Sequence, residues 1–141
     1  MASKFGDQVR AFAEKARMRQ EAIFRESAEA LMEQANTPEG RGGKMPVDTG
    51  FLRNSSVASK DGPGTPDSSD PALVFAALQL GETVWAGWTA AYAMRMEHGF
   101  SGKDSLGRQY EQAGKGFMRA AAQNWDFIVN EVTAKVKARI A

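Results

Sequence analysis

Hydrophobic residues recur every three or four positions at both ends of the chain. Near the N-terminus they form a stripe made of Phe5, Val9, Phe12, Ala16, Ile23 and Leu31. This spacing predicts one long amphipathic helix over residues 3–36, which Ser3 caps and "NTP" at 36–38 ends. At about 1.5 Å per residue the helix would be roughly 50 Å long. A domain of this size does not comfortably cover such a length, so we expect part of the helix to bend, break or pack on another subunit.

The C-terminal segment repeats this pattern. Its stripe consists of Phe117, Ala121, Trp125, Ile128, Val132, Val136 and Ile140. The spacing predicts a second long helix over residues 117–140. Lysine and arginine gather in its last turns, where positive charge suits the helix dipole.

The apolar pattern changes in the middle of the chain. We predict a strand at about 52–59, a buried strand in "ALVFAALQL" (72–80) and another in "TVWAGWTA" (83–90), although periodicity alone also allows a short helix at 72–80. Segments 72–80 and 82–90 form the best hairpin candidate. Trp85 and Trp88 are three apart in the expected strand and so face opposite sides.

Polar, glycine-rich segments separate these elements, at 37–47, 60–71 and 99–116. A short helix over 91–99, ended by Gly99, precedes the last of these loops. Strands grouped between terminal helices predict a single α+β domain over residues 1–141. We therefore expect long N-terminal and C-terminal helices packed on a small antiparallel sheet with long glycine-rich loops.

Composition excludes several classes of site. The 141 residues carry a net charge of +1, which does not predict a nucleic-acid-binding protein. Cysteine is absent and His98 is the one histidine, so neither a thiolate nor a multi-histidine metal site is expected. We expect no cofactor, no metal and no membrane span. The first residues lack the apolar core of a signal peptide, so we expect synthesis in the cytoplasm.

The tripeptide Asp48-Thr49-Gly50 has two interpretations. It matches the active-site signature of aspartic proteases, which in a chain of this length requires a homodimer with two Asp48 carboxylates sharing one proton. A polar glycine loop precedes it, however, whereas such an aspartate normally follows an apolar strand. The alternative is a turn in which Asp48 bonds its own backbone, Gly50 takes a positive φ and Leu52 enters the core. We favour the turn.

Other candidate chemistry is weaker. His98 beside Glu97 suggests acid–base catalysis less than it suggests a helix end. Five basic residues lie in or beside glycine-rich loops, where each fits contact with a phosphate backbone or simple solubility: Arg41, Lys44, Arg53, Lys103 and Arg108.

Three separated segments resemble one protein family. These are "PVDTGFLRNSS" (46–56), "YAMRMEHG" (92–99) and "GKGFMRAAAQNW" (114–125), in that order. Together they resemble the small tail-completion, or head–tail joining, proteins of lambdoid long-tailed bacteriophages. The resemblance implies a structural virion protein and not an enzyme. It implies a homo-oligomeric neck ring, assembled in the bacterial cytoplasm, between the portal complex of the DNA-filled head and the tail tube.

The resemblance also implies roles for particular residues. Asp48, Thr49, Gly50 and Leu52 would determine the fold, as would Tyr92, Glu97 and Gly99. We expect the subunit or partner interface to include Arg41, Lys44, Phe51, Arg53, Tyr92, Glu97, Phe100, Arg108 and Tyr110. Partners would be copies of the chain itself, six or twelve with six favoured, neighbouring neck and tail-tube proteins, and passing DNA without sequence specificity. The alternatives are the Asp48 protease and a small non-phage interaction module.

Overall fold

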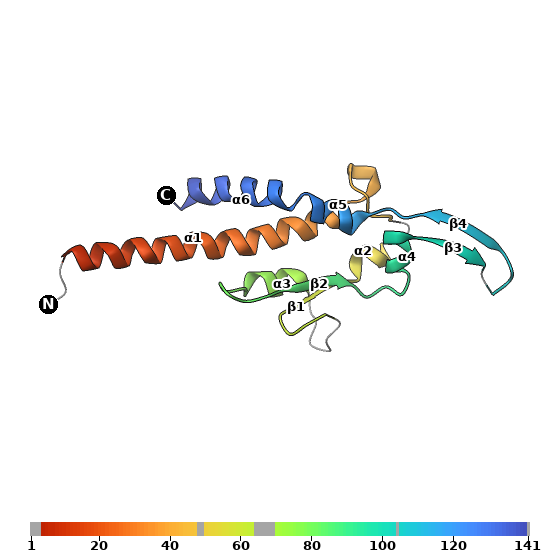
Figure 1. Ribbon diagram of the computed structural model, residues 1–141, viewed down its shortest axis with the longest axis horizontal. Helices are drawn as coiled ribbons and strands as arrows, with labels where there is room; N and C mark the ends of the chain where they lie inside the picture. Colours follow the sequence, from red (N-terminus) through yellow and green to blue (C-terminus); the bar gives the residue numbers. More distant parts are fainter. Residues whose placement is uncertain (1–3, 48–49, 64–69, 104, 141) are drawn as a thin grey trace.

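The chain folds as an elongated α+β domain (Figure 1). We analysed a computed structural model that describes residues 4–47, 50–63, 70–103 and 105–140. Helices account for 57% of these residues, and the same residues form two antiparallel sheets of two strands each. The fold class predicted from the sequence is therefore confirmed.

Helix α1 (Lys4–Ala35) is a single unbroken helix along the long axis of the molecule. Its C-terminal half buries Ala28, Met32 and Ala35 under other elements. Its N-terminal part extends beyond all other labelled elements in Figure 1, and Phe5 and Phe12 there remain 75% and 73% exposed. The helix therefore does not bend or break to cover its whole apolar stripe.

The expected C-terminal helix is two helices, α5 (Phe117–Gln123) and α6 (Trp125–Arg139). Asn124 separates them, and its side-chain Nδ2 donates to Gln34 Oε1 of α1 at 2.8 Å. Asparagine is a poor residue for a helix interior because its side chain competes for hydrogen bonds, and here it ties the break to α1. Helix α6 runs along α1 and packs Ile128, Val132 and Val136 against it.

The middle of the chain differs from the prediction. Residues 72–80 are not a strand, because α3 (Pro71–Ala76) begins there with Pro71 in its first turn and Asp70 as its cap, accepting from Ala72 N at 2.9 Å. The predicted hairpin is consequently wrong. Strand β2 (Trp85–Trp88) instead pairs antiparallel with β1 (Ser56–Ser59).

The strand expected at 52–59 also begins later. Its first part is the short helix α2 (Phe51–Asn54), which Gly50 precedes with φ +82°. Leu52 is 2% exposed, so it enters the core as expected, but from a helix. Asp48 and Thr49 lie outside the described residues.

The segment 99–116 was predicted as a loop and is mostly a hairpin. After α4 (Ala93–His98), Gly99 at φ +90° opens β3 (Gly99–Lys103), which pairs with β4 (Gln109–Ala113). Both strands project from the body at the end opposite to the N-terminus of α1 (Figure 1). All five residues of β4 are exposed, so the alternating apolar pattern that marks a half-buried strand is missing. We call this hairpin the arm.

Trp88 joins the parts of a thin core. It packs against the cluster around Phe75 and Leu78 and also against the cluster around Leu52 and Phe117. Its ring meets Phe117 edge-on at 4.9 Å between centroids, and its Nε1 donates to Asn36 Oδ1 at 2.8 Å. Trp88 is thus the core tryptophan of the pair, while Trp85 is 37% exposed.

The molecule exposes more surface than its mass requires. Its accessible surface is 9608 Å², whereas a compact monomer of 15.3 kDa would expose about 7,100 Å². The difference reflects the two projections and the thin core between them. Among the described residues, no helix combines the length and apolar character needed to cross a membrane.

Candidate functional site

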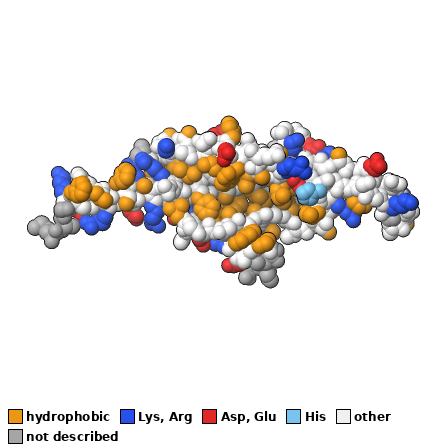
Figure 2. All heavy atoms as spheres, in the orientation of Figure 1, with side chains coloured by type: hydrophobic (Ala, Val, Ile, Leu, Met, Phe, Trp, Pro, Cys, Tyr) orange, Lys and Arg blue, Asp and Glu red, His pale blue; other side chains and the backbone are white. Residues whose placement is uncertain are grey.

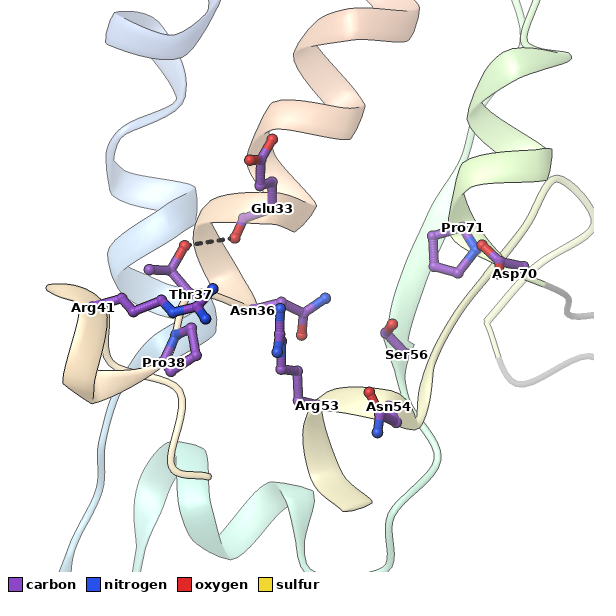
Figure 3. A pocket seen from close by; sticks show the side chains of 10 residues that line it. All are labelled: Glu33, Asn36, Thr37, Pro38, Arg41, Arg53, Asn54, Ser56, Asp70 and Pro71. Carbon is purple, nitrogen blue, oxygen red and sulfur yellow. Dashed lines mark hydrogen bonds between the residues drawn. The ribbon is translucent and has the colours of Figure 1, made fainter. Parts of the chain in front are cut away.

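A polar cleft of about 670 Å³ opens at the C-terminal end of α1 (Figure 3). Its walls come from the end of α1, the following loop, α2, the start of β1 and the cap of α3. The residues that line it are Glu33, Asn36, Thr37, Pro38, Arg41, Arg53, Asn54, Ser56, Asp70 and Pro71. Two of the predicted interface residues, Arg41 and Arg53, are therefore brought together.

The loop that carries Arg41 is held firmly. Thr37 Oγ1 donates to Glu33 O at 2.8 Å, and backbone bonds join Glu39 N to Met45 O and Met45 N to Thr37 O, both at 3.1 Å. Met45 is completely buried and anchors the loop in the core. Between these points lies η1 (Glu39–Arg41), a short 3-10 helix. Arg41 therefore stands on a fixed support.

Close backbone packing makes Gly43 necessary in this loop. A Cβ atom at this position would lie 2.0 Å from the carbonyl oxygen of Thr37. No side chain fits there unless the backbone moves. Glycine at this position therefore allows the loop to pass close to the backbone at the end of α1.

The cleft is lined by two basic side chains, Arg41 and Arg53, and two acidic ones, Glu33 and Asp70. Figure 3 shows the Arg41 and Arg53 side chains both directed toward the end of α1 around Asn36 and Thr37. Neither guanidinium forms an ion pair or hydrogen bond with another described residue. Guanidinium groups bind carboxylates and phosphates through paired donors. The two guanidinium groups are therefore suited to an anionic group of a partner, with the Asn36 and Asn54 amides nearby, while Asp70 accepts from Ala72 N in the helix cap.

An aromatic pair lies on the surface between α2 and α4. The rings of Phe51 and Tyr92 are 6.1 Å apart, and the two residues are 61% and 37% exposed. Both were predicted interface residues. Aromatic side chains at the surface supply much of the binding energy of protein interfaces, so this pair fits the prediction that partners contact it.

Glu97 is buried and bonded within the chain. Its carboxylate accepts from Met118 N at 2.8 Å and from Arg119 N at 2.9 Å, and it is 4% exposed. The N–H groups of Met118 and Arg119 lie in the first turn of α5, where they have no carbonyl partner within the helix. Negative charge at this end of a helix also suits the helix dipole. Glu97 thus caps α5 from a distant part of the sequence, and both of its oxygens are occupied there.

The arm leaves the body beside this cap. A Cβ at Gly114 would lie 2.5 Å from Glu97 O, and a Cβ at Gly99 would lie 2.6 Å from Gln112 O. Lys115 N also donates to Met96 O at 2.7 Å. The two glycines allow the strands to pass this close to the end of α4.

The arm carries two aromatic residues from the predicted interface, Phe100 near its base and Tyr110 nearer its tip. Phe100 and Tyr110 lie 6.5 Å apart as diagonal neighbours of the hairpin, and the Arg95 guanidinium stacks 4.3 Å above the Phe100 ring. Tyr110 is 42% exposed, and Arg108 lies nearer the tip. The arm therefore presents an aromatic pair, with Arg95 stacked on it, that is separate from the Arg41–Arg53 cleft.

Lys44 lies apart from that cleft. It lines a second polar depression with Glu97, His98 and Arg119. Within the described part of the chain, no group of three or more His, Cys, Asp or Glu residues has an arrangement that could hold a metal ion.

Sequence reasoning missed several residues that build these surfaces. Met45 sits between glycines, a lysine and a proline, a context that gives no periodic signal of burial. Arg95 is one position in a short helix, and its contact with Phe100 depends on the hairpin that was not predicted. Neither Met45 nor Arg95 was among the residues that the family resemblance marked.

Comparison of the sequence with protein-family models, with curated proteins and with solved structures found no significant match.

Proposed function

We propose that this chain is a ring-forming structural subunit of a bacteriophage neck, which joins the DNA-filled head to the tail tube. The observation that carries the proposal is the pair of projections at opposite ends of a thin body. The N-terminal part of α1 and the arm have few contacts with the rest of the chain (Figure 1). Ordering such segments costs conformational entropy that a lone domain does not recover. Neighbours in a ring, above it and below it, would recover that cost.

The surface properties support the same proposal. The described surfaces combine an arginine-lined cleft, exposed aromatic pairs and an excess of roughly 2,500 Å² of accessible area over a compact monomer. A standard interface buries about 800 Å² of each partner. The excess accessible area is therefore large enough for more than one interface per subunit. A net charge of +1 lets identical subunits approach without strong repulsion.

The ordered resemblance to tail-completion proteins supplies the particular place in the virion. In that setting six copies are favoured over twelve. The Arg41–Arg53 cleft would bind an acidic group of a neck partner, and basic residues of the arm would meet passing DNA through phosphates alone. The role proposed is assembly and not catalysis.

The test is made in the phage that encodes the chain. Deleting its gene should leave filled heads and finished tails that do not join, and adding the purified chain to that lysate should restore infectious particles. Arg41→Ala combined with Arg53→Ala should reduce this restoration, whereas Lys137→Ala, on an exposed position of α6, should not. Normal joining of heads and tails in the deletion strain would overturn the proposal.

The alternative protease makes an opposite demand on Asp48. If it were correct, the purified chain would cleave a peptide and Asp48→Asn would abolish the cleavage. On our proposal the native chain cleaves nothing.

A further inference from the structure

An apolar groove of about 470 Å³ crosses the middle of the molecule where α1, β2 and α5 meet. Leu31 and Met32 of α1 form part of it, Val84 and Trp88 lie on one side, and Met118 and Trp125 lie on the other. Figure 2 shows hydrophobic side chains gathered over this region. Met118 and Trp125 are 46% and 38% exposed, so the groove is open to solvent along its rim.

A second apolar surface lies on the projecting end of α1. Phe5, Val9 and Phe12 share one helical face, at spacings of four and three residues, and are 75%, 50% and 73% exposed. Figure 2 shows hydrophobic side chains on this projecting end, separate from the central group. We call Phe5, Val9 and Phe12 the N-terminal stripe.

Nothing within the described chain covers the stripe. Arg19 Nε donates to Ile140 O, just after α6, at 2.5 Å. Helix α6 therefore covers α1 only as far towards the N-terminus as about Arg19. Of residues 4–18, all but Gly6 and Ala16 are exposed. An isolated helix of this length is marginal in water. This part of α1 therefore has a strong reason to acquire a partner.

The stripe cannot reach the groove of its own molecule. Val9 and Leu31 belong to the same unbroken helix, so they are separated by roughly 33 Å along its axis. The stripe and groove match in kind, since a helix with apolar anchors at i, i+4 and i+7 is what an apolar groove accepts. Any contact between them must come from two molecules.

Surface area agrees with a second copy as the occupant. The charged residue in the groove lining is Glu82, and Lys60 Nζ forms an ion pair with its carboxylate at 3.2 Å. The groove therefore presents an almost wholly apolar surface, which suits the apolar stripe. The excess surface noted above also exceeds what one subunit contact requires.

We propose that the N-terminal stripe of one molecule docks in the apolar groove of a second copy of this chain. The contact joins two different surfaces, so it is heterologous and each molecule keeps one free stripe or one free groove. Such contacts close a ring when the rotation between neighbours permits. This contact would join neighbouring subunits of the proposed ring. It rests on the self-assembly part of the proposed function and does not depend on where the ring lies in a virion.

The first test is complementation between two variants of the full chain. Phe12→Glu spoils the stripe and Ala122→Glu spoils the groove, which Ala122 lines from an exposed position. Each variant alone should self-associate at least tenfold more weakly than the native chain in sedimentation velocity. Mixed in equal amounts, they should form a two-chain complex, because one intact stripe then meets one intact groove.

Matched controls place the same new charges elsewhere. Phe127→Glu and Ala138→Glu lie on exposed positions of α6 outside the groove lining, and both should leave self-association within about twofold of native. Circular dichroism should show native helicity for all four variants. A native chain that stays monomeric at its highest soluble concentration would overturn the proposal, as would a mixture that does not associate.

A cross-linking test covers the case in which a charged variant fails to fold. The chain has no cysteine, so single cysteines report one site each. Phe12→Cys mixed with Ala122→Cys should give a disulfide between different molecules, and Phe127→Cys mixed with Ala122→Cys should not. Cross-linking that is equal in both mixtures would refute the docking. These tests can succeed while heads and tails join normally in the strain that lacks the gene. That result would disprove the neck function alone, and the contact between copies would stand.

Discussion

The two halves of α1 have the same kind of apolar spacing and opposite surroundings. In the C-terminal half, Ala28, Met32 and Ala35 are buried under α3, α5 and neighbouring elements. In the N-terminal half, Phe5 and Phe12 are among the most exposed apolar residues of the described chain. The comparison teaches that periodicity identifies which face of a helix seeks cover, while the rest of the fold decides whether the same chain supplies it.

Hydrogen exchange should separate the halves most widely. At a concentration where the chain is monomeric, amides of residues 5–18 should exchange with opening free energies near zero, and those of residues 24–35 should approach the global value of about 5–15 kcal/mol. Mass spectrometry of peptic fragments measures both. Equal protection of the two halves in the monomer would break the comparison. Raising the concentration should protect residues 5–18 selectively.

Truncating one apolar residue in each half should give unequal losses of stability. Met32→Ala removes a side chain that is 7% exposed and should cost about 2–3 kcal/mol of unfolding free energy, because it leaves a void beside Leu78. Phe12→Ala should change the monomer by less than about 0.5 kcal/mol. Urea unfolding of both variants measures the contrast. A loss for Phe12→Ala equal to that of Met32→Ala would show that the N-terminal half is covered within the chain.

Polar contacts should follow the same contrast with smaller values. Asn36→Ala removes the acceptor of Trp88 Nε1 at the covered end and should cost about 1–2 kcal/mol. Arg10→Ala removes an exposed ion pair with Asp7 at the uncovered end and should cost about 0–0.5 kcal/mol. The same urea experiment applies. If Arg10→Ala proved the more destabilising of the two, the uncovered half would contribute more to the fold than its exposure indicates.

Acid should weaken slightly the contacts of Glu82, which lines the groove beside the covered half of α1. The pKa of the Glu82 carboxyl lies below its usual value in the folded chain, chiefly because Gln79 N donates to the carboxylate and next because Lys60 does. A lowered folded pKa means that this stabilisation is present above the unfolded pKa and is lost as pH falls through the folded pKa. Glu82→Gln should therefore flatten the fall in melting temperature below about pH 4.5. An unchanged acid profile in Glu82→Gln would remove Glu82 from this account.

The sequence predicted the parts of the fold whose signal is long and periodic. The stripe from Phe5 to Leu31 predicted α1 nearly to its ends, and Gly99 marked the end of α4. The failures occurred where short signals compete. "ALVFAALQL" is mostly apolar and fits a strand or a helix, and the Asp70 cap followed by Pro71 favours the helix. The arm has few apolar positions to alternate, so its strands resembled a loop.

The candidate site was predictable only in part for the same reason. Arg41 and Arg53 stood out as basic residues near glycines, but their meeting depends on how α2 packs under the end of α1. The apolar groove is lined by five elements, α1, α3, β2, α5 and α6, which are spread over most of the sequence. No local sequence pattern predicts such a surface. The N-terminal stripe from Phe5 to Phe12 is visible in the sequence as an apolar helical face, and the structure shows that no other described element covers it.

The cap formed by Glu97 has a mechanical consequence. Met96 and Glu97 receive hydrogen bonds from Lys115 to Arg119, so the root of the arm and the first turn of α5 form one stiff joint. Met118 in that turn also borders the apolar groove. The root of the arm and the wall of the apolar groove therefore belong to one hydrogen-bonded unit, which includes the first turn of α5.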